Sequence, residues 1–137
     1  MLVKQISVFL ENKEGRLAEV TEILAQSGIN ISALTIADTS TFGILRLIVE
    51  DPSKTESLLK SKGFSVSLTD VIAVDIDDRP GGLSKPLSML YKNGISVEYI
   101  YAFISKKENT ARVVLKVNDT NHAVDMLEDN GYKYTGK

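Results

Sequence analysis

The sequence predicts an α+β protein made of two tandem βαββαβ units, each an antiparallel sheet with its helices on one face. Three observations predict this class. An internal repeat spans nearly the whole chain, alternating and helical apolar spacings follow one another in the same order in both copies, and glycines recur at matching element ends. The 137 residues are 43% hydrophobic, which is enough to form a core.

The two copies align with one sequence offset in their first part and a slightly larger offset in their last part. A shift of 66 residues aligns Gly15 with Gly81 and Gly28 with Gly94, and a later shift of 68 aligns Gly63 with Gly131. The change of shift places two extra residues in the second copy, in the polar segment 105–110, where a hairpin tip is expected. We therefore predict one domain over residues 1–69 and a second over residues 70–137.

The first half of the first copy reads as a strand and a helix. Residues 3–10 alternate, with Ile6, Val8 and Leu10 on one face, as in a half-buried strand. After a turn, apolar residues recur at helical spacing over residues 16–27. Gly28 follows where a helix commonly ends in a left-handed conformation.

The second half reads as two strands, a helix and a strand. Residues 30–38 and 44–49 are β-prone, and Asp51 before Pro52 is typical of a capped helix start. That helix ends near Gly63, and residues 64–68 form the last strand. This order is that of the ferredoxin-like fold, and the second copy repeats it. There, Pro86 costs no hydrogen bond if Ser84 caps the helix.

Composition excludes several function classes. The 16 Lys and Arg against 18 Asp and Glu give a net charge of -2, unlike a nucleic-acid binder. The lack of cysteine excludes disulfides and thiolate chemistry, and His122, the single histidine, reads as a surface residue. With no catalytic set, phosphate loop, signal peptide or apolar membrane span in the pattern, we expect a cytoplasmic protein that is not an enzyme, holds no cofactor or metal, and touches no membrane.

The turn before the first helix of each copy carries the candidate site. It reads Asp77-Asp78-Arg79-Pro80-Gly81-Gly82-Leu83 in the second copy and Glu11-Asn12-Lys13-Glu14-Gly15-Arg16-Leu17 in the first. With Gly28-Ile29-Asn30-Ile31 and Gly94-Ile95-Ser96-Val97, these segments resemble the ACT domain family of amino-acid-sensing modules. The second copy matches the family's turn pattern closely, whereas the first has Glu14 in place of the proline. The resemblance covers nearly the whole chain, twice.

The resemblance implies a binding site for a free amino acid at the turn, completed at an interface between two units. A helix N-terminus offers N–H groups to a carboxylate, a glycine permits close approach, and Asn or Asp accepts from an ammonium. The residues implied are Asn12, Gly15, Arg16, Leu17, Asn30 and Ile31 in the first copy, and Asp78, Gly81, Gly82, Leu83, Ser96 and Val97 in the second.

Each candidate residue also has a purely structural explanation. Gly15 and Gly81 fit a turn that needs positive φ, although a second glycine, Gly82, is not needed for such a turn. Asn12 and Asp78 fit helix caps, and Asn30 and Ser96 fit the satisfaction of backbone groups at a strand start. Arg16 also fits a solvated surface position.

Three functions are therefore compared. The first is a stand-alone amino-acid sensor. The second is a regulatory subunit that acts only in complex with a biosynthetic enzyme of the acetolactate synthase or aspartokinase type, and the third is an enzyme with an unrecognised site. The first is favoured, and the third has no residue pointing to it. Aromatic and aliphatic residues alternate over 99–104, so both faces of that strand need a cover, and we expect a homodimer.

Overall fold

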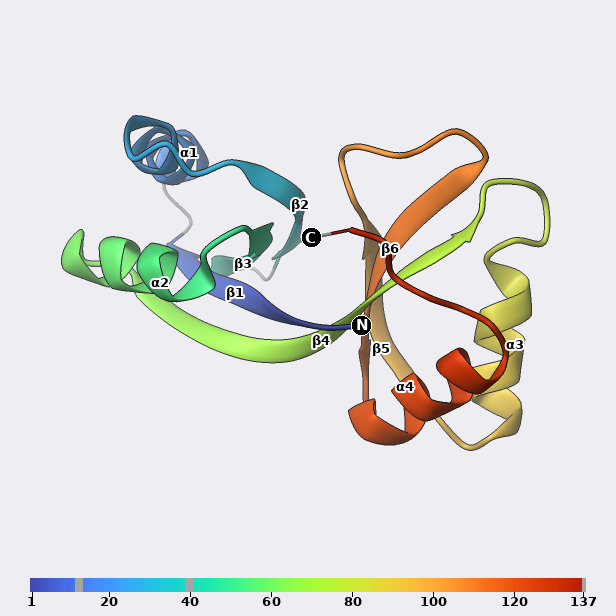
Figure 1. The fold of residues 1–137 in the computed structure, drawn as a ribbon. Helices are drawn as coiled ribbons and strands as arrows, with labels where there is room; N and C mark the ends of the chain where they lie inside the picture. Colours follow the sequence, from blue (N-terminus) through green and yellow to red (C-terminus); the bar gives the residue numbers. More distant parts are fainter. Residues whose placement is uncertain (12–13, 39–40, 137) are drawn as a thin grey trace. The chain divides into compact units, whose positions relative to one another are not determined.

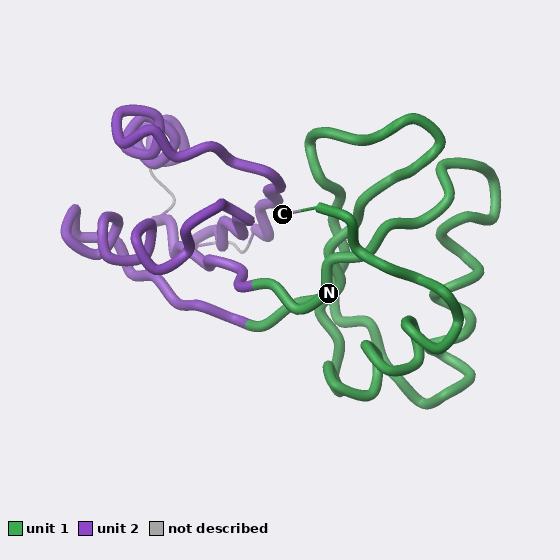
Figure 2. Tube along the Cα trace, in the orientation of Figure 1, with its two compact units in different colours: residues 1–3, 70–137 green, residues 4–69 purple. Residues whose placement is uncertain are grey.

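The computed structural model describes residues 1–11, 14–38 and 41–136, and it divides into two compact units (Figure 2). The N-terminal unit comprises residues 4–69, and the C-terminal unit comprises residues 70–137 together with residues 1–3. Residues 1–3 lie with the C-terminal unit because the Ala73 N–H donates to the Met1 carbonyl at 2.8 Å and Met1 packs against that unit's core.

The N-terminal unit is a four-stranded sheet with two helices on one face (Figure 1). The chain runs through β1 (Leu2–Glu11), α1 (Arg16–Gln26), β2 (Ile31–Asp38), β3 (Phe42–Val49), α2 (Pro52–Ser61) and the start of β4 (Ser65–Asp77). The strand order is β2-β3-β1-β4, and β3 is antiparallel to both of its neighbours. Ile6, Val8 and Leu10 on β1 are buried against the helices, as the alternation predicts.

The C-terminal unit repeats this plan from the end of β4 onward. It continues through α3 (Ser84–Lys92), β5 (Val97–Ala102), β6 (Thr110–Val117) and α4 (Thr120–Asp129), with strand order β4-β6-β5. Helices α3 and α4 cover one face of this sheet (Figure 1). The predicted class, α+β with tandem ferredoxin-like units, is confirmed.

The last strand of the second copy is shorter than predicted. It is reduced to one bridge between Asp75 and Lys133. Two residues later, the Thr135 N–H donates to the Asp75 side chain at 3.1 Å rather than to a strand backbone. A side-chain acceptor has thus replaced a ladder hydrogen bond, which ends the pairing.

The second helix of each unit begins with the same kind of cap, an aspartate side chain. Asp51 caps α2 through the Lys54 N–H at 3.1 Å, as predicted, and Asp119 caps α4 through the His122 N–H at 3.2 Å. At α3 the cap position is Leu83 rather than Ser84. Pro86 nevertheless stays in the first turn, so it removes no helical hydrogen bond.

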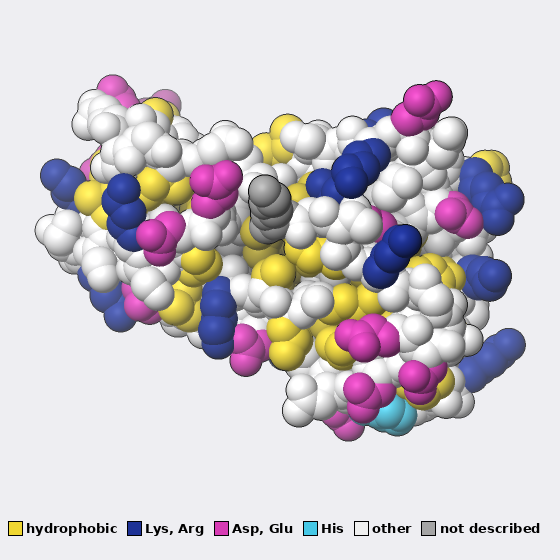
Figure 3. Space-filling model, viewed as in Figure 1, with side chains coloured by type: hydrophobic (Ala, Val, Ile, Leu, Met, Phe, Trp, Pro, Cys, Tyr) yellow, Lys and Arg dark blue, Asp and Glu magenta, His cyan; other side chains and the backbone are white. Residues whose placement is uncertain are grey.

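The structure confirms the prediction that the single histidine, His122, is a surface residue. The His122 side chain is 46% exposed, and Figure 3 shows it in cyan near acidic side chains. None of the helices in the described ranges is long and apolar enough to cross a membrane.

Candidate functional site

Each unit has an open cavity beside the turn that precedes its first helix. The cavity of the N-terminal unit has a volume of about 340 Å³, and that of the C-terminal unit about 590 Å³. The smaller one is lined by Phe9, Leu10, Glu11, Arg16, Phe42, Gly63, Phe64 and Ser65. The repeat places these opposite Asp75, Ile76, Asp77, Gly82, Thr110, Gly131, Tyr132 and Lys133, all of which line the larger one. The cavities are therefore equivalent positions of one repeat.

Strand pairing explains why the equivalence holds. Glu11 at the end of β1 pairs with Phe42 at the start of β3, and Asp77 at the end of β4 pairs with Thr110 at the start of β6. Each cavity thus lies where the first strand of the unit meets the start of its third strand. The segment after the second helix closes the other side.

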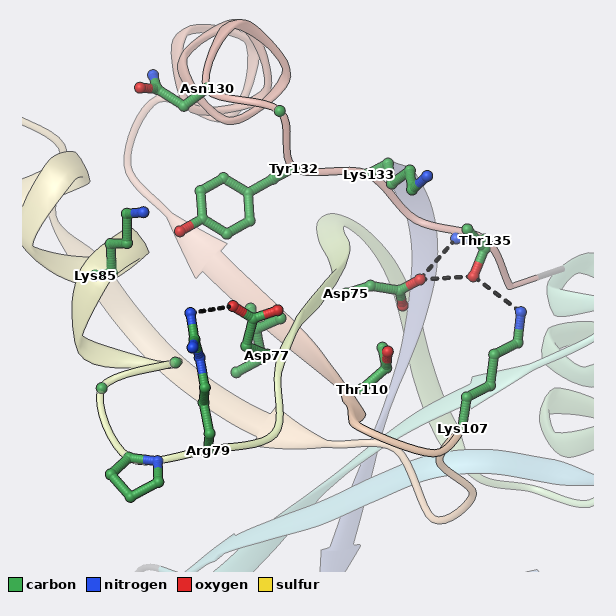
Figure 4. Close-up of a pocket in the computed structure, with 15 residues that line it drawn as sticks. Asp75, Asp77, Arg79, Lys85, Lys107, Thr110, Asn130, Tyr132, Lys133 and Thr135 are labelled. Atoms are coloured by element: carbon green, nitrogen blue, oxygen red, sulfur yellow. Dashed lines mark hydrogen bonds and ion pairs between the residues drawn. The ribbon is translucent and has the colours of Figure 1, made fainter.

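The C-terminal cavity is strongly polar. Arg79 and Asp77 form an ion pair at 3.2 Å across the turn, with both side chains mostly exposed. Figure 4 shows the Tyr132 hydroxyl directed toward the side of the cavity where Lys85 and Arg79 lie. Burial, and secondarily the Asp77 carboxylate, raise the pKa of Tyr132 above its ordinary value of 10.0. The hydroxyl therefore keeps its proton at neutral pH and remains a hydrogen-bond donor.

A side-chain network centred on Asp75 holds the opposite wall. The Arg112 Nε donates to Asp75 Oδ1 at 3.0 Å, and both side chains are 15% exposed or less. The Thr135 hydroxyl donates to Asp75 Oδ2 at 2.6 Å and accepts from Lys107 Nζ at 3.2 Å (Figure 4). The Asp75 carboxylate is thus already neutralised. The cationic groups of Lys85 and Lys133 have no ion-pair partner within the described part of the chain.

The N-terminal cavity is aromatic instead. The Phe9 and Phe42 rings lie 6.2 Å apart between centroids. The Arg16 guanidinium lies 4.8 Å from the centre of the Phe64 ring, and one of its Nη atoms donates to Glu19 at 3.0 Å. Rings at Phe9 and Phe42 replace the carboxylate of Asp75 and the hydroxyl of Thr110, and Phe64 lacks the hydroxyl that Tyr132 carries in the other cavity.

Of the twelve residues predicted from the sequence, three line these cavities: Arg16, Gly81 and Gly82. Asn12 lies outside the described residues. Gly15, Leu17, Asp78 and Leu83 belong to the two turns and first helical turns but are not among the lining residues. Their place in the function remains a prediction.

The four remaining candidates lie at the other end of their sheets. Ile31 pairs with Val49, seven residues along β3 from Phe42, which is roughly 23 Å away along the strand. Val97 pairs with Val117 at the corresponding place in the C-terminal unit. Within one unit, Asn30, Ile31, Ser96 and Val97 are therefore not brought to the glycine turn. The Ser96 backbone bonds to Asn118 in both directions, at 2.9 and 3.2 Å.

The structure gives Gly82 and Asp78 specific roles. A Cβ at residue 82 would collide with the Asp77 carbonyl oxygen, and the Gly82 N–H already donates to the Arg79 carbonyl at 2.9 Å. The second glycine is therefore needed by the turn itself, contrary to the sequence argument, and its N–H is not free for a carboxylate. Asp78 does not cap α3, which has no side-chain cap; it pairs with Lys106 at 2.5 Å.

Several lining residues escaped the sequence reasoning because they are distant from the turn in the chain. They come from the start of β3, the connection between β5 and β6, and the segments after the second helix of each unit: Phe42, Lys107, Phe64, Tyr132, Lys133 and Thr135. The internal repeat contained a signal that could have located the segments after the second helices. Gly63 with Phe64 aligns with Gly131 and Tyr132, so matched glycines mark these segments as well as the turns.

Comparison with known proteins finds a matching family and a similar solved structure. A family described as an ACT domain pair matches residues 1–136. No curated protein matches significantly. The solved structure of protein BT0572 from Bacteroides thetaiotaomicron is 43% identical, with a TM-score of 0.91, and the match covers 97% of this chain and 91% of that one.

A more distant likeness links the fold to a regulatory protein. The ligand-free regulatory subunit of aspartate kinase from Thermus thermophilus is 16% identical, with a TM-score of 0.69, and the match covers 96% of this chain and 97% of that chain. The structure of the alpha and beta subunits of an aspartokinase matches with 18% identity and a TM-score of 0.56, over 93% and 95% of the two chains. At 16% and 18% identity, these two matches show a similar fold.

Proposed function

Because the chain belongs to the family of ACT domain pairs, we propose that it is a regulatory protein that binds a free amino acid and performs no chemistry on it. The observation that carries the proposal is the recurrence of a cavity beside the glycine turn of both units. A small ligand held there contacts the turn, the first helix and the segment after the second helix, so its binding energy can bias the arrangement of these elements.

The charges of the C-terminal cavity suit a zwitterion. The ammonium groups of Lys85 and Lys133 offer partners for a ligand carboxylate, and the Asp77 carboxylate, exposed beside Arg79, offers one for a ligand ammonium. Since the Gly82 N–H is used within the turn, it is not available to the ligand carboxylate, and the lysine side chains supply contacts in its place. The remaining predicted residues, among them Asn12, Asn30, Ser96 and Val97, stay predictions that rest on the family resemblance.

Calorimetric titration of the full chain with each of the twenty amino acids tests the proposal. We expect saturable binding of one or a few of them, with the bound amino acid recovered unchanged by NMR after prolonged incubation. Lys85→Gln should weaken that binding about tenfold, the loss of one charge-assisted contact. Lys92→Gln, at the other end of α3, is the matched control and should bind normally. Absence of heat with all twenty, or consumption of the ligand, would contradict the proposal.

A regulatory subunit that acts in complex with a biosynthetic enzyme is the second candidate. The match to nearly the whole aspartate kinase regulatory subunit of Thermus thermophilus favours it, since that protein is a separate chain of the same two-unit plan. It predicts that the chain co-purifies with a larger catalytic protein from its source. A stand-alone sensor would bind its amino acid with the same affinity before and after such a partner is removed.

A homodimer is part of the proposal. Ile100 is 37% exposed and Ile104 63% exposed, so this edge of the C-terminal unit presents aliphatic side chains to solvent. Covering them against a second copy would bury that apolar surface. Sedimentation at micromolar concentration should give a dimer, and a clean monomer would argue against this part of the proposal.

A further inference from the structure

The N-terminal cavity has a different ligand chemistry from that of the C-terminal cavity. We propose that it is a second, non-equivalent site, which takes a planar aromatic ring bearing a carboxylate. The inference extends the proposed function, since it assigns a ligand class to the first of the two repeated cavities. It stands on three features of the described residues: the aromatic lining, the placement of Arg16, and the contrast with the equivalent positions of the second copy.

Two aromatic side chains of the lining are partly exposed to solvent. The Phe9 and Phe42 side chains remain 42% and 38% exposed, although each lies within reach of another ring. Large aromatic side chains exposed together in a concave surface are typical of ligand sites, because a third ring can add to such a pair in an offset or edge-to-face arrangement. The volume of about 340 Å³ falls in the range of about 300–1,000 Å³ that is typical of small-molecule pockets.

Arg16 supplies the anion-binding group. Its guanidinium lies against Phe64 at the wall of the cavity, and its Nε is buried without a hydrogen-bond partner among the described residues. One Nη pairs with Glu19, so the Nε edge of the fork carries the unsatisfied donor. A carboxylate binds this planar edge in a bidentate manner, and a modest turn of the side chain toward the cavity would present it. A buried donor left without a partner is unfavourable, so a ligand that pairs it gains in affinity.

The second copy shows that this combination is specific to the first. At the position of Arg16 it has Gly82, which no other residue can replace without a collision, and at the positions of Phe9 and Phe42 it has Asp75 and Thr110. A ring placed in the C-terminal cavity would meet the polar network around Asp75. The same ligand therefore should not bind both cavities equally.

Three probes that differ by one group each test the inference on the full chain. L-phenylalanine carries ring, carboxylate and ammonium; 3-phenylpropionate lacks the ammonium; phenethylamine lacks the carboxylate. Two-dimensional NMR spectra of the labelled protein locate the bound probe by its shifts. We expect L-phenylalanine and 3-phenylpropionate to perturb residues around Phe9, Phe42 and Arg16, and phenethylamine to bind at least about tenfold more weakly, the effect of losing a charge-assisted pair.

Variants separate the contribution of the cation from that of the fold. Arg16→Gln should weaken 3-phenylpropionate binding about tenfold while the spectrum stays that of a folded protein. Lys54→Gln, which removes an exposed cation elsewhere in the same unit, should leave it unchanged. If Arg16→Gln perturbs folding, Phe9→Ala, which changes a side chain that is 42% exposed, tests the aromatic wall instead and should also weaken binding.

The outcomes are distinct from those of the amino-acid screen. Equal binding of phenethylamine and 3-phenylpropionate, shifts confined to residues 70–136, or no binding of any probe would overturn the aromatic carboxylate site. A polar amino acid could still bind the C-terminal cavity in that case, which would leave the proposed function intact. Conversely, binding of 3-phenylpropionate but of none of the twenty amino acids, L-phenylalanine included, would contradict the proposed function and restrict this site to aromatic carboxylates without an ammonium group.

Discussion

The two cavities occupy the same place in the repeat, yet their linings have opposite character. Phe9, Phe42 and Phe64 surround one, whereas Asp75, Thr110 and Tyr132 hold the same positions in the other. The backbone around them is conserved between the units, down to the strand pairs that end at each turn and the capped starts of α2 and α4. The comparison teaches that one arrangement of strands and helices can carry two chemically different linings.

The largest expected effect is a loss of stability when the side-chain network around Asp75, in the C-terminal cavity, is disrupted. Asp75→Ala removes the acceptor of Arg112 and Thr135 and leaves a mostly buried guanidinium without its carboxylate, which should cost about 3 kcal/mol in the free energy of unfolding. Urea unfolding followed by circular dichroism measures it. The equivalent change, Phe9→Ala, alters a side chain that is 42% exposed and should cost less than about 1 kcal/mol. Equal losses would show that Asp75 has no special structural role.

The next effect concerns Gly82, at whose position the first turn has Arg16. Gly82→Ala places a Cβ against the Asp77 carbonyl oxygen and should destabilise the chain by about 2 kcal/mol. Gly81→Ala, which meets open space but must keep a φ of +84°, should cost about 1 kcal/mol. Thermal unfolding of both variants tests the order. A milder effect at residue 82 than at residue 81 would mean that the turn rearranges freely.

A smaller effect is expected from a substitution that makes the N-terminal cavity resemble the C-terminal cavity. Phe42→Thr installs the residue that the second copy has at Thr110 and removes one of the two exposed rings. Binding of 3-phenylpropionate should weaken about tenfold, or about 1.4 kcal/mol, as measured by calorimetry. The exchange lies at a partly exposed strand start, so stability should change little. Unchanged affinity would show that the Phe9–Phe42 pair is not the binding surface.

The smallest effect is a pH dependence found in one unit. The raised pKa of Tyr132 means that its protonated form is favoured in the folded protein. The resulting stabilisation is fully present below the unfolded pKa, near 10, and is lost as the pH rises through the higher folded pKa. Stability should therefore fall above about pH 10. Tyr132→Phe should make that fall shallower, since Phe cannot ionise, and an identical alkaline profile would exclude Tyr132 as a contributor.

Much of the fold followed from local patterns in the sequence. The alternation at Ile6, Val8 and Leu10, the Asp51-Pro52 helix start and the paired glycines each act within one turn or strand, so they could be interpreted without knowing the neighbours. The matching order of these patterns in two copies then fixed the class. The shortened last strand was missed because its cause is a contact between Asp75 and Thr135, which are far apart in the chain.

The candidate site was predicted less completely for the same reason. The glycine turn could be located, but the walls of each cavity come from segments such as those at Phe42 and Lys133, whose position depends on strand pairing. The reason for Gly82 was also hidden, because only the folded turn brings the Asp77 carbonyl against it. The twelve predicted residues mix groups at both ends of the sheets.

The hydrogen bond from Ala73 to Met1 makes the C-terminal unit discontinuous along the polypeptide. A fragment beginning at residue 70 would lack the carbonyl that Ala73 uses and the methionine side chain that packs on the core. During synthesis, Met1 precedes Ala73, its hydrogen-bond partner, by 72 residues. A change at residues 1–3 therefore acts on the unit formed by residues 70–137.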